Sequence, residues 1–120
     1  MKAAGEPVSS IETLEWVKFR PVDPTSFEFK VNLIASEYTM AYSVDLVRVP
    51  VGGFSPPHTD PDNHAFYILA GRGAITIDGR IWNVGPGSVV KIPVGIVHSV
   101  TNSGDVPLEF LTIYDPPRPR

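Results

Sequence analysis

Short runs of β-forming residues, each ended by proline or glycine, are the feature of this chain that most limits its fold. The 120 residues include 13 prolines and 10 glycines, and both residue types interrupt helices and mark turns. Eight runs between them alternate apolar with polar residues or are rich in β-branched and aromatic side chains. They span residues 27–33, 43–49, 65–69, 74–77, 81–84, 89–92, 97–100 and 108–114. We therefore predict an all-β fold, a sandwich or a barrel.

Length and terminal composition predict one domain with loose ends. A chain of 120 residues fits a single domain. We expect a flexible segment at 1–10, a barrel domain over 11–115 and a flexible tail at 116–120, where prolines prevent strand pairing.

Charge and apolar content exclude several classes of protein. The net charge is −3 with no basic run, whereas nucleic-acid binding needs clustered lysine and arginine. No stretch approaches the roughly 18 apolar residues of a membrane helix, and the N-terminus lacks an apolar signal core. There is no cysteine for a disulfide or a thiolate ligand. We expect a cytoplasmic protein with neither a nucleic-acid nor a membrane partner.

The chain has three histidines, and their positions are informative. His64 begins a strand with period two and shares a face with Phe66 and Ile68. His98 likewise shares a face with apolar residues, and His58 follows a pair of prolines. A buried imidazole needs a partner for each ring nitrogen, and a metal ion is one way to supply it.

A carboxylate accompanies the histidines. Asp60 lies two residues after His58, so an extended chain places both side chains on one side. Nitrogen and oxygen donors together suit manganese, iron(II), cobalt, nickel or zinc better than calcium. The alternative for Asp60 is a turn residue within 59–63, and we assign Asp62 and Asn63 to that turn alone.

These residues resemble the two motifs of the cupin superfamily. Its first motif runs Gly, five residues, His-x-His, three or four residues, Glu, six residues, Gly. Its spacing is kept here from His58 to Gly71, and Gly53 precedes His58 by four intervening residues. Its second motif runs Gly, five residues, Pro-x-Gly, two residues, His, three residues, Asn. The matching residues are Gly87, Pro93, Gly95, His98 and Asn102.

The resemblance implies a single-domain jelly-roll β-barrel of six to eight strands with one divalent transition metal inside one end. The implied ligands are His58, Asp60, His64 and His98. Two positions depart from the family, because Asp60 replaces its second histidine and His64 replaces its glutamate. Three histidines and one carboxylate remain, so the ligand charge of −1 is retained.

Strand alternation predicts which residues surround the metal. If Arg48 and Glu109 face water, Asp45 faces inward, as do three residues of the last run. The predicted substrate-pocket residues are Phe66, Ile68, Phe110 and Thr112. Asp45 and Tyr114 are candidates for proton transfer, with a solvated position at a sheet edge as the alternative for Asp45.

The expected function is that of a mononuclear-metal enzyme of the oxygenase type. Because the predicted pocket is mostly apolar without clustered arginine or lysine, a small, partly apolar, oxygenated substrate fits better than a sugar phosphate. One alternative is a lyase, decarboxylase or isomerase that uses the metal as a Lewis acid. Another is a binding or sensor protein without turnover.

A homodimer is the expected assembly. An open jelly roll exposes sheet edges, and Tyr67 and Leu69 fall on the face opposite His64. Residues 12–20 suit either a helical turn or a strand, and the segment 11–19 is a candidate to pack across the dimer.

Overall fold

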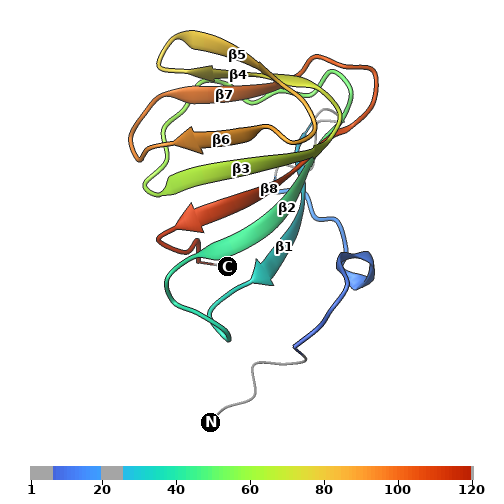
Figure 1. Cartoon of the computed structure of the whole chain (residues 1–120), viewed down its shortest axis with the longest axis vertical. Coiled ribbons are helices and arrows are strands. Elements are labelled where there is room, and N and C mark those ends of the chain that lie inside the picture. The colour runs from blue at the N-terminus through green and yellow to red at the C-terminus, as the bar shows by residue number, and fades with distance from the viewer. Residues whose placement is uncertain (1–6, 20–25, 120) are drawn as a thin grey trace.

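The computed structural model describes residues 7–19 and 26–119, which form eight strands (Figure 1). One short 3-10 turn, η1 (Ile11–Thr13), precedes them. The strands are β1 (Glu28–Ile34), β2 (Ser43–Val49), β3 (Asn63–Ala70), β4 (Gly73–Ile77), β5 (Arg80–Val84), β6 (Val89–Ile92), β7 (His98–Asn102) and β8 (Leu108–Asp115). Within the described residues, no helix has the length and apolar character needed to cross a membrane.

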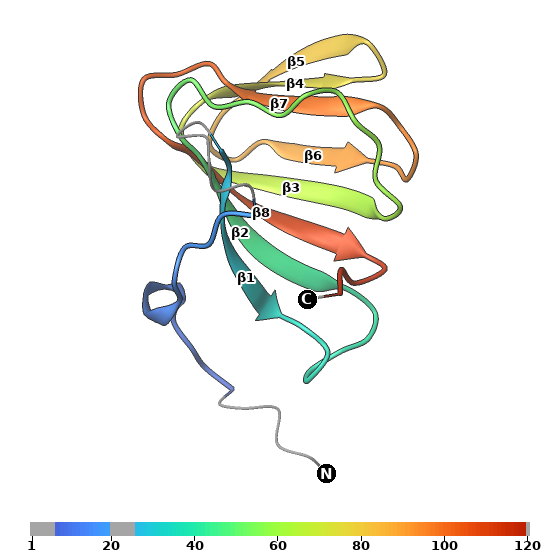
Figure 2. The same cartoon turned by 180° about the vertical axis from the view of Figure 1, so that it is seen from behind.

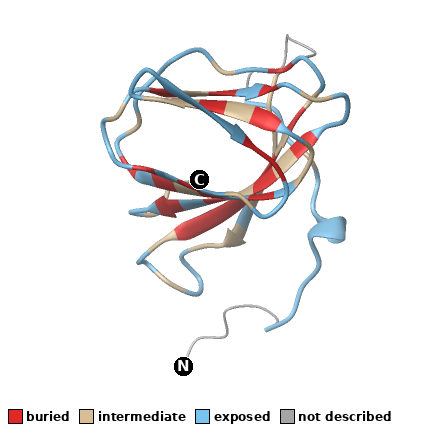
Figure 3. Ribbon diagram, turned by 45° about the horizontal axis from the view of Figure 1, so that its top comes forward, coloured by how far each residue is buried: buried red, intermediate tan, exposed pale blue. Residues whose placement is uncertain are grey.

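The strands form two antiparallel sheets, so the predicted all-β jelly roll is confirmed. One sheet has the order β1-β2-β8-β3-β6 and the other β5-β4-β7. Figures 1 and 2 show both sheets from opposite sides, and Figure 3 shows them as two layers with buried residues in each. The two sheets are not closed into a ring. The loop after β2 runs along β7 instead, through bridges at Phe54–Thr101 and His58–His98.

The core lies between the sheets and follows the alternation of the strands. On β3, His64, Phe66 and Ile68 are buried while Tyr67 and Leu69 are exposed, as the period-two pattern predicts. The central cluster consists of Val47, Val49, Phe66, Ile68, Ile75, Val84, Val90, Ile92, Val100, Leu108 and Phe110.

Glycine conformation shapes the turn between β4 and β5. Asp78 and Gly79 have φ angles of 50° and 81°, which a two-residue hairpin of the mirror-image type requires. A tight hairpin therefore forms here, and its register runs from Gly73–Val84 to Ile77–Arg80.

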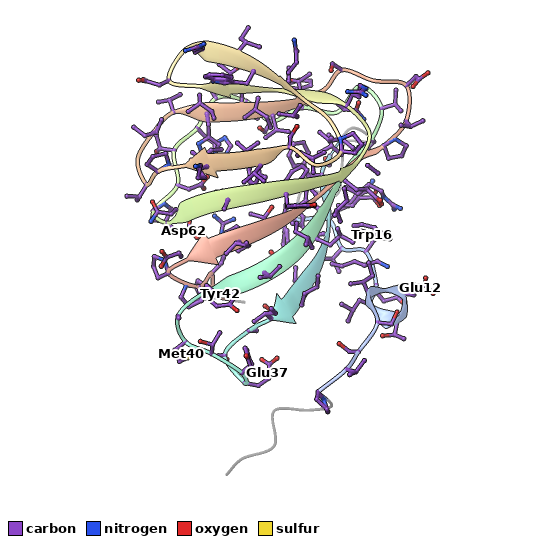
Figure 4. All side chains as sticks on the ribbon, viewed as in Figure 1. Glu12, Trp16, Glu37, Met40, Tyr42 and Asp62 are labelled. Carbon is purple, nitrogen blue, oxygen red and sulfur yellow. The ribbon has the colours of Figure 1, made fainter. Side chains whose placement is uncertain are left out.

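The N-terminal segment packs on its own barrel. Within the ambiguous stretch 12–20, the described residues contribute to η1 and to a bridge between Val17 and Phe29; Arg20 lies outside the described part. Trp16 lies on the β1 side (Figure 4), under the cations of Lys30 and Arg48, at 4.9 and 4.0 Å from its ring centroid. Residues 1–6 and 120 are also outside the described part, and flexibility of the two terminal segments stays a prediction.

Candidate metal centre

The fold brings the three histidines together at one end of the space between the sheets. His58 and His98 face each other in an antiparallel bridge, with backbone N···O distances of 3.0 and 2.9 Å. Their ring centroids are 4.4 Å apart, and the His64 ring on β3 lies 5.7 Å from that of His98. His98 begins β7 rather than lying within a strand, since Ile96 and Val97 belong to the preceding loop.

Asp60 lies at the centre of this group. Its Oδ2 atom is 3.2 Å from His58 Nε2, 3.1 Å from His98 Nε2 and 3.7 Å from His64 Nε2. The same oxygen is buried and accepts no hydrogen bond from any described residue. A buried carboxylate oxygen in this state is costly unless a cation meets it.

The outer nitrogens of two rings fix the tautomer of the neutral imidazoles. His58 Nδ1 lies 2.8 Å from the Pro56 carbonyl oxygen, and His98 Nδ1 lies 2.9 Å from that of Ile96. Because a carbonyl only accepts, each Nδ1 carries a proton, and in the neutral imidazole each Nε2 therefore directs a lone pair at Asp60. Metal-bound histidines typically hold their second nitrogen in this way.

The donor set fits a divalent transition metal. With neutral imidazoles, lone pairs of two rings and a carboxylate converge, and one metal cation can satisfy all three together. Ligands about 2.1 Å from an ion in adjacent positions lie about 3.0 to 3.4 Å apart, in keeping with the separations of Asp60 Oδ2 from His58 and His98. Ligand atoms of His58, Asp60 and His98 form one group within 4.8 Å, and those of Asp60, Asp62 and His64 form another.

Asp62 belongs to the site, although the sequence assigned it to a turn alone. It is 6% exposed, and its Oδ1 atom lies 2.9 Å from His64 Nε2. Figure 4 shows Asp62 where β3 begins. Period-two alternation, continued back from His64 through Asp62 and Asp60 to His58, was the signal that places all four on one side.

Arg118, like Asp62, belongs to the site but was not predicted from the sequence. Its Nη2 atom lies 3.4 Å from Asp60 Oδ1, 3.2 Å from Asp62 Oδ1 and 2.9 Å from His64 Nε2. Its guanidinium carbon is 4.3 Å from the Tyr114 ring centroid, and its backbone N–H donates to Ser43 Oγ. One arginine therefore enters the pocket, although it was not among the predicted site residues.

Burial sets the protonation of His64. Removal from water lowers the pKa of this imidazole below its usual 6.5, and the positive Arg118 lowers it further, while Asp60 and Asp62 act in the opposite direction. At neutral pH the ring is therefore uncharged, the form that binds metals.

A cavity of about 800 Å³ opens beside the histidines. Of the residues predicted to line it, Phe66, Phe110, Thr112 and Tyr114 do so. Ile68 shares their inward orientation but lies in the core with 0% exposure, and it does not line the cavity.

Asp45 is buried away from this cavity. It is 1% exposed, so the alternative of a solvated sheet edge is wrong. Its Oδ1 atom accepts a hydrogen bond of 2.9 Å from the backbone N–H of Asn32. Asn32 has a φ of 60°, at the place where the β1–β2 register shifts between Lys30 and Ile34. Asp45 thus satisfies an amide at a β-bulge, and the geometry does not favour a proton-transfer role.

Comparisons with known proteins match this fold. Residues 45–114 match the profile of the family Cupin_2, described as a cupin domain. A curated protein of Methanocaldococcus jannaschii, named only as uncharacterized, is 37% identical over 70 residues, which are 58% of this chain and 56% of that protein. The chain spans between 16% and 56% of the length of the first curated relatives that it matches.

Two solved structures illustrate the likeness. The polyketide cyclase RemF from Streptomyces resistomycificus superposes with a TM-score of 0.78 at 22% identity, covering 96% of this chain and 82% of that one. A predicted oxalate decarboxylase from Thermotoga maritima gives 0.76 at 23% identity, covering 90% and 97%. At these identities the likeness establishes the fold alone.

Proposed function

This chain belongs to the cupin family, and we propose that it is an enzyme that binds one divalent transition metal and acts on a small, partly apolar, oxygenated compound. The proposed reaction is of the oxygenase type with iron or manganese. The observation that carries the proposal is the group of three Nε2 atoms within 3.1 to 3.7 Å of Asp60 Oδ2.

The residues around that group have separable roles. His58, His98 and Asp60 would hold the ion, and His64 would provide a fourth ligand. A bound ion would supply Lewis-acid polarisation of a substrate oxygen and, if redox-active, reaction with dioxygen. Phe66 and the neighbouring aromatic rings would exclude water from the apolar side of the cavity.

Metal content is the first test. By elemental analysis, protein purified without added metal is expected to hold about one equivalent of a transition metal per chain. His98→Ala should abolish loading, whereas Ser99→Ala, its neighbour on β7, should leave loading unchanged. Less than about a tenth of an equivalent in the wild type, even after incubation with iron, manganese and zinc, would contradict the proposed site.

Oxygen consumption tests the reaction type. The iron-loaded and manganese-loaded proteins are expected to consume dioxygen with members of a panel of phenols, enols and diketones, and the His98→Ala variant should not. The zinc-loaded protein serves as the control without redox chemistry. If the protein were fully loaded with iron or manganese and consumed no oxygen with any compound of the panel, the proposed oxygenase reaction would be wrong.

A non-redox lyase, decarboxylase or isomerase is the second candidate. Asp62, His64 and Arg118 form a contiguous group that can hold a proton beside the proposed metal. Relatives of this chain include an oxalate decarboxylase of Bacillus subtilis, 30% identical over 115 residues, which are 26% of that protein. Product formation by the zinc-loaded protein without oxygen would favour this candidate, and tight binding without any product would favour a binding protein.

A further inference from the structure

The walls of the cavity beside the proposed metal site are aromatic to an unusual degree. The chain contains six phenylalanines, and all six line this cavity: Phe19, Phe27, Phe29, Phe54, Phe66 and Phe110. They come from separate parts of the sequence, so the clustering is a product of the fold. The rings of Phe66 and Phe110 are 4.7 Å apart, and those of Phe19 and Phe29 are 5.1 Å apart.

Two of these rings lie at the surface. Phe19 is 53% exposed and Phe54 is 58% exposed, while Phe66 and Phe110 are almost fully buried. The aromatic lining therefore continues from the core to the mouth of the cavity. A volume of about 800 Å³ lies within the range of small-molecule sites, and flat rings gain affinity by stacking on such walls.

A buried hydroxyl faces this cavity without a partner. Thr112 is 2% exposed and lines the cavity. Its Oγ1 atom makes no hydrogen bond to any residue that the structure describes. A buried hydroxyl is costly in that state, and an oxygen on a bound molecule would satisfy it.

Arg118 adds a positive group with unused donors. The contacts of its side chain to Asp60, Asp62 and His64 all use Nη2. Its Nε and Nη1 atoms donate to no residue within 7–19 or 26–119, and the side chain is 27% exposed. A free N–H donor of a guanidinium suits an oxyanion.

The net charge of the site indicates how many negative charges a ligand should carry. Among the described residues that line the cavity, Asp60 and Arg118 are the charged ones at neutral pH, and Asp62 adjoins them. The two carboxylates, the guanidinium and a divalent ion together carry one positive charge. A ligand with one negative charge would neutralise the site.

From these features we infer that the cavity binds a flat aromatic acid with a single negative charge. Its ring system lies between the phenylalanines, its anionic oxygens meet Arg118, and a neighbouring oxygen bonds to Thr112. This inference rests on the proposed function for the metal's charge, and it makes Arg118 and Thr112 determinants of substrate specificity.

Calorimetric titration with 1-hydroxy-2-naphthoate tests the inference, on the protein with and without bound Zn²⁺. Arg118→Gln is expected to weaken binding about 10- to 100-fold, and Thr112→Val about 3- to 10-fold. Arg80→Gln is the matched control, because Arg80 stacks on Trp82 outside the cavity. The neutral 1-hydroxy-2-naphthamide and the aliphatic decanoate should each bind at least about 10-fold more weakly than the naphthoate.

The outcomes separate this inference from the proposed function. Absence of zinc binding would overturn the proposed function, while the comparison of wild type with Arg118→Gln would still decide the role of Arg118. The inference would be overturned if the naphthoate did not bind, or if the wild type and Arg118→Gln bound the naphthoate with equal affinity. Stronger binding of decanoate than of the naphthoate would also overturn it. Circular dichroism of each variant checks that the fold is retained.

Discussion

Asp60 and Asp62 carry the same functional group two residues apart, yet the structure gives them different neighbours. Asp60 directs Oδ2 at three imidazole nitrogens, whereas Asp62 contacts His64 and Arg118. Asp60 therefore has the position of a metal ligand, and Asp62 that of a neighbouring carboxylate on the Nε2 atom of His64. Arg118 contacts both and partly neutralises them.

We predict that Asp60→Asn and Asp62→Asn differ in their effect on metal affinity. Loss of a charged ligand should raise the zinc dissociation constant by at least about 100-fold, whereas loss of a neighbouring negative charge should raise it about 10-fold. Competition with a chromophoric chelator measures both, and Asp105→Asn at the exposed Asp105 is the control. A larger effect of Asp62→Asn would reverse the assignment.

The second residue-scale prediction concerns Asp45. Asp45→Ala leaves the Asn32 amide without its side-chain acceptor, which should lower the free energy of unfolding by about 1 to 3 kcal/mol. Asp45→Asn keeps an acceptor oxygen and should cost less, and zinc affinity should be unchanged in both. Urea denaturation measures the stability. Unchanged stability of Asp45→Ala with loss of turnover would instead support a role in proton transfer.

At the scale of elements, the glycine that ends the first motif is explained by packing between the β3–β4 turn and β8. Gly71 has a φ of +81°, and a Cβ there would collide with the Pro107 carbonyl oxygen. Asn102 secures the same region, because its side chain donates to the carbonyl oxygens of Val49, Pro50 and Val106 and accepts from the Gly104 N–H.

Gly71→Ala and Gly52→Ala form a matched pair that tests this explanation. Both positions have a positive φ, but nothing lies within 4 Å of a Cβ at Gly52. Both substitutions therefore carry the conformational cost of about 1 to 2 kcal/mol, and only Gly71→Ala adds a collision. We expect Gly71→Ala to lower the free energy of unfolding by at least about 2 kcal/mol more than Gly52→Ala does. Equal values from urea denaturation would contradict this account.

At the scale of the whole molecule, apolar side chains remain exposed on the outer face of the larger sheet. Tyr67, Leu69, Val89 and Ile113 are between 38% and 62% exposed. Tyr67 pairs with Val89 in register, and Ile113 pairs with Ala65, so these exposed residues lie on the neighbouring strands β6, β3 and β8. Such a patch is typical of a protein interface.

We predict that this patch forms the interface of a homodimer. Light scattering after size exclusion should give about twice the chain mass of 13.1 kDa. Leu69→Lys combined with Val89→Lys should give a monomer with the fold retained, whereas Val106→Lys at an exposed loop position should stay dimeric. A wild-type mass near that of one chain would overturn the prediction.

The sequence by itself determined the strands and their inward faces, because period-two alternation is imposed by local backbone geometry. The resemblance to the two cupin motifs implied that the histidines gather at one site. Only the tertiary structure decided the roles of Arg118, Asp45 and the six phenylalanines. Arg118 follows β8, and it reaches the site because β8 pairs with β3 so that Tyr114 lies opposite His64. That pairing is a contact between residues distant in sequence, and alternation along one strand carries no information about which strand lies beside it.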